Sequence, residues 1–229
     1  MPGEYDFNGI PELSPVNYVD YIGLSSNPYN TVLRNSSIGW VIRDGGANDY
    51  GLENVYLPGD GRCYSESNTY ARWNNIIIGG LTFDANENSW PDIKGEFRNI
   101  NILPSADAFF AVNSIDGIFE NIYGQGLNSI FRAGNSINGT FSNIFTDGIT
   151  GDSFKSVASI DGYFENIEIY NSPITIFDSR GINGKFRNLK FKSVNQIFVP
   201  GITGMVDVDF DGVIGIDCQN ILTSISSVS

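Results

Sequence analysis

Apolar and polar positions recur along this chain with a period of 22 or 23 residues. The recurring block reads I-x-G-x-F-x-N-I, and its five clearest copies begin at Ile93, Ile115, Ile137, Ile160 and Ile182. After each block, apolar residues alternate with other residues for a few positions, which is typical of short β-strands rather than helices. A fixed period of this length predicts a solenoid in which each block belongs to one coil.

Other solenoids fit this period less well. Ankyrin and tetratricopeptide repeats run to about 33 or 34 residues and need helical periodicity, which the blocks lack. Leucine-rich repeats require an L-x-x-L-x-L ladder, and left-handed β-helices count in hexapeptides. We therefore predict an all-β fold, a right-handed single-stranded parallel β-helix of about nine coils, with about 22 residues and three short strands in each coil.

Each position of the block has a physical reason. The phenylalanine is expected to point inward and to stack on its counterpart one coil away, at roughly the 4.8 Å spacing of neighbouring strands. The asparagine is expected at a left-handed bend, which Asn tolerates better than other non-glycine residues, and stacked asparagines can bond to one another. These ladders are Phe97, Phe119, Phe141, Phe164 and Phe186, and Asn99, Asn121, Asn143, Asn166 and Asn188.

The same frame extends in both directions from the clear blocks. It adds Asn35, Asn54 and Asn75 to the asparagine column, and it places Val208 in the asparagine position of the last coil. A second aromatic column is expected between the blocks, formed by Phe110, Phe131, Phe154, Phe177 and Phe198. We expect one domain over 1–229, with N-terminal coils at 1–50, less regular coils with loops at 51–92, regular repeats at 93–204 and a C-terminal coil at 205–229.

The asparagine bends and the 22-residue coil resemble those of the pectate-lyase-like superfamily of parallel β-helices. The P-G-E-Y-D-F run at 2–7 and the I-G-L-S-S run at 22–26 are similar to the first coils of bacteriophage tailspike and tail-fibre domains. The resemblance covers nearly the whole chain, and it is more specific for fold than for activity. It implies a β-helix in a virion setting.

Composition and charge exclude several functions. The chain has 13 basic and 26 acidic residues, no histidine and a net charge of -13, so it would repel nucleic-acid phosphates and anionic lipid. The absence of histidine removes the usual proton shuttle and the Ser-His and Cys-His nucleophile systems. Cys63 and Cys218 lie about seven coils apart in this frame, so we expect both to be free thiols.

A glycan contact is expected in the less regular coils. Polar and aromatic residues concentrate at 58–72 and 84–92, and exposed aromatic faces beside carboxylates and amides suit sugar rings. The residues assigned to this contact are Arg62, Tyr64, Glu66, Tyr70 and Trp90. The alternative is an ordinary loop whose aromatic residues pack on the helix wall.

Carboxylates are numerous, but we expect none of them to be catalytic. Glycoside hydrolysis needs two carboxyl groups about 5–9.5 Å apart, as in a pair such as Glu120 and Asp116, yet stacked coils create this spacing automatically. Asp207, Asp209 and Asp211 alternate along one segment, which suits calcium, although an acidic outward face explains them equally well. We expect no cofactor and no bound metal.

Together these features predict a chain that binds or builds rather than catalyses. We expect a structural or receptor-facing β-helix module of a virion, such as a tailspike, tail fibre or other surface component of the extracellular particle. The alternatives are a polysaccharide lyase or glycoside hydrolase of the same superfamily, and a bacterial adhesin that is secreted or held at the cell surface.

The expected partners follow from the uncovered ends of the solenoid. No amphipathic cap helix precedes or follows the coils, so we expect either that the chain is part of a longer polypeptide or that a homotrimer or other virion subunits cover the ends. Host surface polysaccharide is the other expected partner, whereas neither nucleic acid nor membrane insertion is expected.

Overall fold

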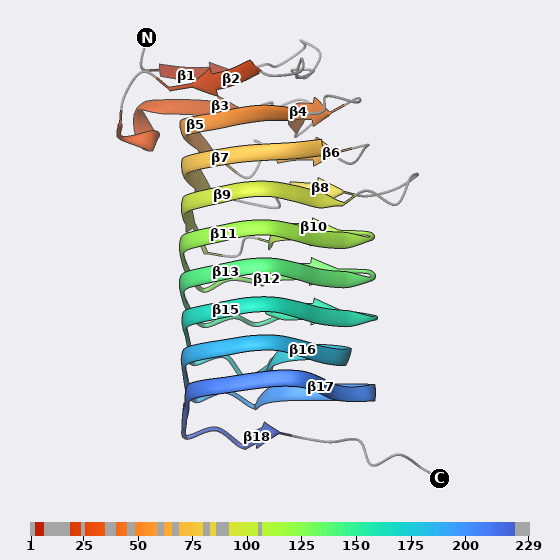
Figure 1. The fold of residues 1–229 in the computed structure, drawn as a ribbon. Helices are drawn as coiled ribbons and strands as arrows, with labels where there is room; N and C mark the ends of the chain where they lie inside the picture. The colour runs from red at the N-terminus through yellow and green to blue at the C-terminus, as the bar shows by residue number, and fades with distance from the viewer. Residues whose placement is uncertain are drawn as a thin grey trace.

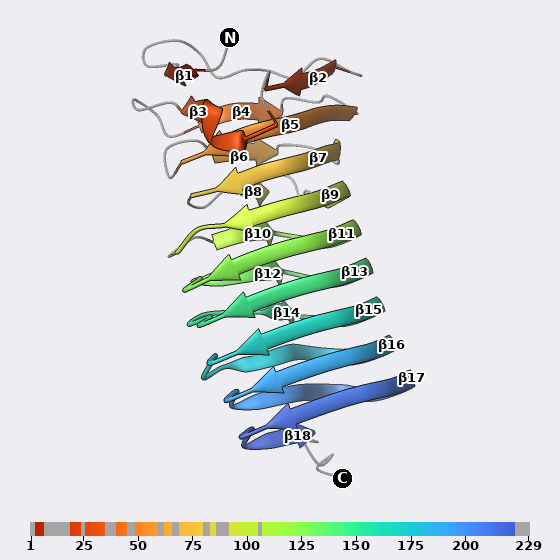
Figure 2. The same cartoon turned by 90° about the vertical axis from the view of Figure 1, so that its left-hand side faces the viewer.

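The chain winds as a right-handed parallel β-helix, as the direction of the strands in two perpendicular views shows (Figures 1 and 2). This computed structural model describes residues 3–6, 19–23, 26–34, 40–44, 49–58, 62–65, 69–79, 83–85, 92–104 and 107–222. The described part forms about seven turns, roughly 22 residues apart, slightly fewer than the nine expected. The predicted fold class, an all-β parallel solenoid with Asn and Phe ladders, is confirmed.

Three faces run along the helix, and they are defined by the corner at the block asparagine. Face A carries the segments before that corner, such as 115–120, and face B carries the segments after it, such as 122–125. Face C carries the separate shorter strands, such as 129–133. Figure 1 looks onto face A, and Figure 2 looks onto face B.

The strands all pair in parallel with the strand one coil away. Faces A and B are made by β5 (Asp49–Leu57), β7 (Thr69–Ile78), β9 (Ile93–Ile102), β11 (Ser114–Gln125), β13 (Ser136–Asp147) and β15 (Ser159–Tyr170). Face C is made by β4 (Trp40–Asp44), β6 (Arg62–Ser65), β8 (Phe83–Ala85), β10 (Asp107–Ala111), β12 (Ser129–Ala133) and β14 (Phe154–Ser156). The strands β16 (Thr175–Lys192) and β17 (Gln196–Ile216) run continuously around all three faces, and β18 (Asn220–Leu222) follows.

The first described elements continue the same pairing pattern. They are β1 (Gly3–Asp6), β2 (Val19–Ile22), the short 3-10 helix η1 (Pro28–Asn30) and β3 (Thr31–Arg34). β1 pairs with β3, and β2 pairs with β5. The P-G-E-Y-D-F run at 2–7 therefore contributes a strand, Gly3–Asp6, to the N-terminal end of the helix.

The corner between faces A and B is a ladder of left-handed asparagines. The φ angles are 51° to 57° at Asn54, Asn75, Asn99, Asn121, Asn143, Asn166 and Asn188. In the regular coils, each Nδ2 donates to the Oδ1 of the preceding corner, for example from Asn143 to Asn121 and from Asn166 to Asn143, both at 3.0 Å. The ladder slips once, where Asn99 donates to Asn74 at 2.8 Å. Asn35 lies outside the described residues.

The last corner is not where the sequence frame placed it. Extra residues in β17 shift its register against β16, so that Val208 pairs with Gly184, the glycine position of the block. Asp207 has a φ of 54° within this irregular stretch, as expected of a β-bulge. The asparagine position is occupied instead by Gly212, with a φ of 71°, one coil after Asn188. Assigning it to Val208 was wrong because an insertion of this kind has no signature in the repeat.

The core is a double column of aromatic rings. The block phenylalanines stack face to face with centroids 4.8 to 5.0 Å apart from Phe97 to Phe186, as predicted. The second column stacks beside the first, and rings of the two columns meet edge to face, as between Phe131 and Phe141 at 5.1 Å. Edge-to-face and offset contacts are the favoured geometries for aromatic rings, so both columns stabilise the coil spacing.

The second column begins at Phe109 rather than at Phe110. Phe109 pairs in register with Phe131, is buried, and stacks on it at 5.3 Å. Phe110 points outward instead, where the guanidinium of Arg132 lies 5.2 Å from its ring centroid. Successive residues of a strand face opposite sides, so only one of two adjacent phenylalanines can enter the core. The register with Phe131 selects Phe109.

The block glycine allows one coil to approach the next on face A. A Cβ placed on Gly117 would lie 2.2 Å from the carbonyl oxygen of Gly95, and the φ of Gly139 is 114°. Residues with a side chain rarely adopt this backbone conformation, and no side chain fits the space between the coils. The glycine is therefore required both by the backbone and by the stack.

We predict that Phe141→Ala destabilises the fold by about 3–5 kcal/mol, because the cavity cannot close between fixed coils. The ring is fully buried and is stacked at 5.0 Å on both Phe119 and Phe164. Equilibrium urea unfolding measures the change, with the neighbouring outward-facing Ser142→Ala as control. Near-wild-type stability of Phe141→Ala would contradict the assigned register.

We predict that Asn143→Ala destabilises the fold by about 1 kcal/mol more than Asn143→Gly. Both variants lose the side-chain bonds to Asn121 and Asn166, but alanine also has to adopt the φ of 54° at this corner. The same unfolding experiment gives the comparison. If alanine were equal or superior to glycine, a left-handed corner would be ruled out.

Candidate functional site

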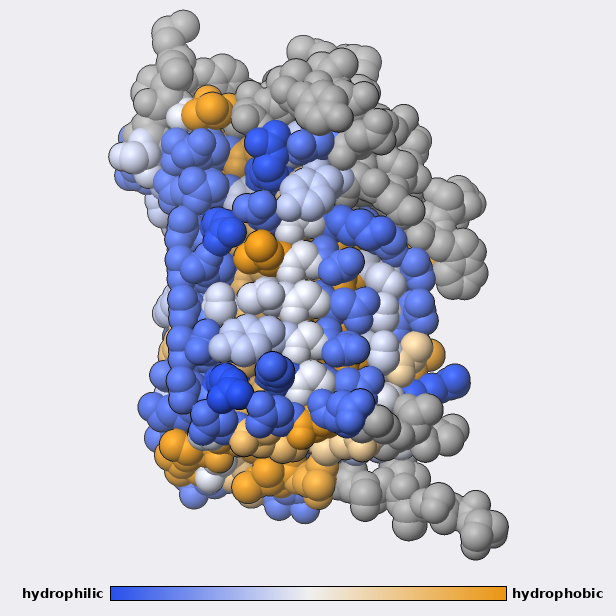
Figure 3. Space-filling view, in the orientation of Figure 1, coloured by the Kyte–Doolittle hydropathy of each residue, from blue (hydrophilic) through white to orange (hydrophobic). Residues whose placement is uncertain are grey.

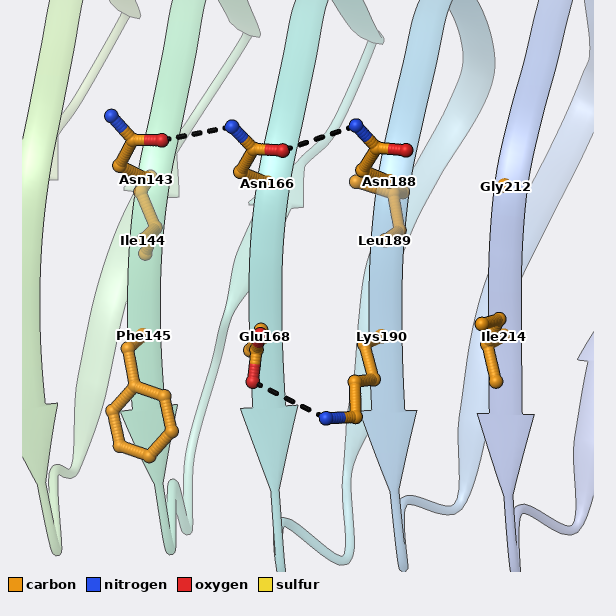
Figure 4. A pocket seen from close by; sticks show the side chains of 10 residues that line it. All are labelled: Asn143, Ile144, Phe145, Asn166, Glu168, Asn188, Leu189, Lys190, Gly212 and Ile214. Carbon is orange, nitrogen blue, oxygen red and sulfur yellow. Dashed lines mark hydrogen bonds and ion pairs between the residues drawn. The ribbon is translucent and has the colours of Figure 1, made fainter.

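An open trough runs along face B beside the asparagine ladder. It encloses about 600 Å³, and one wall is formed by the corner residues Asn143, Asn166 and Asn188. The other side is formed by the outward side chains two positions further along each strand, as Figure 4 shows. The trough is lined by Asn143, Ile144, Phe145, Asn166, Glu168, Asn188, Leu189, Lys190, Gly212 and Ile214.

The trough exists because of the strand alternation after the corner. Ile144 and Leu189, the residues that directly follow their corners, point into the core and are buried. The next residue of each strand points outward, and the parallel register aligns Tyr123, Phe145, Glu168, Lys190 and Ile214 in one column. Two rows of outward side chains are thus separated by a row that faces inward, which leaves a channel parallel to the helix axis.

The N-terminal part of this column, at Tyr123 and Phe145, is aromatic. Tyr123 is 48% exposed and its ring lies parallel to that of Phe145, with centroids 5.3 Å apart. Tyr170, from the next coil, meets Phe145 edge to face at 5.4 Å. Figure 4 shows the ring of Phe145 on the outer side of the sheet, at the edge of the trough. The parallel rings of Tyr123 and Phe145 form an apolar platform beside the amides.

The lower part of the column is a neutralised charge pair. The ammonium of Lys190 lies 3.7 Å from the carboxylate of Glu168, which also accepts a hydrogen bond from the Tyr170 hydroxyl. The same ammonium lies 5.4 Å from the Tyr170 ring centroid. The hydrogen bond with Tyr170 and the attraction of Glu168 raise the pKa of Lys190 above its usual value.

The ladder amides keep capacity for a ligand. Each side-chain amide has two N–H donors and two acceptor lone pairs; the ladder bonds use one of each at Asn143 and Asn166, and one donor at Asn188. The trough therefore offers uncharged donors and acceptors at regular intervals, opposite an aromatic platform and one internally balanced ion pair. This combination suits rings that carry hydroxyl groups on their edges and C–H groups on their faces.

The glycan contact expected from the sequence falls largely outside the described side chains. Arg62 and Tyr64 lie on β6 of face C, whereas Glu66 and Trp90 lie outside the described residues. Tyr70 lies on β7, is 40% exposed, and donates a hydrogen bond to Glu96 at 3.2 Å. Partial burial and the nearby Glu96 raise the pKa of Tyr70. The grouping of these five residues stays a prediction.

A smaller hollow of about 140 Å³ lies on face A and is lined by residues of β5, β7 and β9. Its charged residues are engaged with one another or with neighbours: Arg72 pairs with Asp49 at 2.9 Å, and Arg98 pairs with Glu96 and Glu120. Binding a ligand there would require breaking these contacts. We therefore favour the trough on face B as the candidate site.

Three of the carboxylates considered for catalysis or calcium, Glu120, Asp209 and Asp211, have structural partners. Glu120 is ion-paired with Arg98 rather than grouped with Asp116, while Asp209 and Asp211 hold the guanidinium of Arg187 at 2.7 and 2.8 Å. Among the residues that the structure describes, no three acidic, cysteine or histidine side chains lie close enough to hold a metal ion. Cys218 is a free thiol, and the side chain of Cys63 lies outside the described part.

Comparisons with known proteins leave the site to be judged by its geometry. No protein-family model, no curated protein and no solved structure matches this chain. Within the described residues, no helix is long and apolar enough to cross a membrane.

The sequence carries a signal for the trough at a position outside the repeat. The position two residues after the ladder asparagine varies from block to block, and it reads Asn101, Tyr123, Phe145, Glu168 and Lys190. Because it does not contribute to the repeat, it reads as ordinary solvent-exposed variation. Its residues become a site only when the coils are aligned.

We predict that Glu168→Gln lowers the pKa of Lys190 towards its usual value, because the carboxylate that favours the charged ammonium is removed. A pH titration of the lysine side-chain signals by NMR measures this. Glu165→Gln, on face A, is the matched control and should leave the Lys190 titration unchanged. An unchanged pKa in Glu168→Gln would contradict the ion pair.

Proposed function

We propose that this chain is a rigid, receptor-facing β-helix module of a virion surface that contacts a host glycan through the trough on face B. The observation that carries the glycan contact is the alignment of outward aromatic rings, spare amide groups and an ion pair along one channel. A stack of parallel coils with a fully packed aromatic core supports the role of a stiff module. The virion setting rests on the similarity of the first coils to tailspike and tail-fibre domains.

Association with other subunits is part of this proposal. The C-terminal coil exposes large apolar side chains, among them Phe210 at 44%, Ile214 at 53% and Leu222 at 55%. Figure 3 shows apolar residues gathered over this end, in contrast to the polar surface of face A. Exposed apolar groups of this kind are typical of interfaces, so a trimer or another virion subunit is the partner that we propose.

We predict that Phe145→Ala weakens binding to host surface polysaccharide about tenfold, equivalent to about 1.4 kcal/mol, because the platform loses a ring face. Glycan microarrays followed by calorimetry on the bound polysaccharide measure the change. Tyr163→Ala, which removes an aromatic side chain from face A, is the control and should bind normally. Equal affinity of Phe145→Ala and wild type would remove the trough from the proposal.

Incubation of the protein with host surface polysaccharide distinguishes binding from catalysis. If the chain only binds, the polysaccharide is recovered with no new reducing ends and no unsaturated sugars. Turnover that is lost on changing one outward carboxylate would overturn the proposal and favour a carbohydrate-active enzyme. Binding by a chain found on a bacterial surface rather than on particles would favour an adhesin.

A further inference from the structure

We infer that the trough on face B binds an uncharged linear oligosaccharide lying parallel to the helix axis, and that it discriminates against glycans carrying carboxylates. This inference rests on the proposed glycan contact and specifies the ligand class of the same site. Three features carry it: the periodic wall, the internally balanced charges and the spare amide groups.

The direction of the ligand follows from the periodicity of the wall. Corner residues Asn143, Asn166, Asn188 and Gly212 line the trough from four successive coils. At about 4.8 Å per coil, the four positions span about 14 Å along the axis. A ligand that uses this whole length has to be extended and made of several sugar units. In the direction perpendicular to the axis, the row of corner residues offers only one residue from each coil.

The charge balance selects the ligand class. Lys190 is the one cation among the residues that line the trough, and Glu168 neutralises it at 3.7 Å. A carboxylate on the ligand would have to compete with Glu168 for the same ammonium and would lie close to the charge of Glu168. The chain as a whole carries -13 charges, so its field also opposes the approach of an acidic polymer.

The polar wall satisfies hydroxyl groups without charge. A sugar hydroxyl both donates and accepts, and each ladder amide of the trough offers at least one N–H and one lone pair beyond its ladder bonds. The aromatic platform of Tyr123 and Phe145 covers C–H faces at the upper end of the trough. Every recognition element on this face is therefore neutral or internally neutralised.

The test compares unsubstituted linear glucan and xylan oligosaccharides with oligogalacturonate of matched length. Calorimetry at low and high salt gives the affinities, and NMR follows the side-chain amides of Asn143, Asn166 and Asn188. We expect a neutral oligosaccharide to bind and shift these amides, with little dependence on salt. We expect the oligogalacturonate to bind at least tenfold more weakly.

Glu168→Gln gives an independent readout, because it leaves Lys190 without its carboxylate. The variant should raise the affinity for the oligogalacturonate relative to that for the neutral ligand at least threefold, and Glu165→Gln should leave this ratio unchanged. If the wild-type protein prefers the acidic oligosaccharide, the inference is overturned while the proposed glycan contact stands.

The remaining outcomes separate the two claims. Neutral binding that leaves the ladder amides unshifted overturns the inference, because the ligand then lies elsewhere. Failure of every linear neutral probe also overturns it. Only the additional failure to bind host surface polysaccharide removes the proposed function.

Discussion

The left-handed corner at the block asparagine constrains the rest of the molecule. A corner residue with positive φ turns the chain from face A to face B at the same point in each coil, and the side-chain amide ties that point to the next coil. Because every coil turns at the same position, the strands stay in parallel register and like residues stack on like. The aromatic columns, the glycine contacts and the trough all depend on this repetition.

The stacking of the coils also explains why inward positions repeat while outward positions vary. Inward positions repeat because each ring must match the ring above and below it, with centroids about 5 Å apart. Outward positions are free of this constraint, and residues of either charge occur there. Basic residues concentrate on β16, whose Arg187 pairs with aspartates of β17 and whose Lys190 pairs with Glu168 of β15. These exposed pairs favour the register without dominating the free energy of folding.

The repeat predicted the fold because its residues report directly on backbone geometry. Asparagine marks the left-handed corner, and phenylalanine marks the inward face, so both ladders could be assigned by number. The repeat misplaced the last corner because the register of β17 shifts without any change in residue type that marks the shift. The irregular stretch moves that corner to Gly212. The repeat also assigned the wrong one of Phe109 and Phe110 to the core. These neighbours are identical, so only the strand register shows which of them points inward. The trough was not predicted at all, because its residues differ in every coil and are joined only by alignment.

The most direct test of this account is hydrogen exchange of the ladder side-chain amides. Selective 15N labelling of asparagine would allow the Nδ2 protons of Asn121, Asn143 and Asn166 to be followed by NMR. Each of these amides donates at 3.0 Å to the corner one coil before it. The account predicts that one proton of each amide exchanges far more slowly than the same group in the unfolded chain. Exchange as fast as in the unfolded chain, at all three positions, would contradict the ladder and the register built on it.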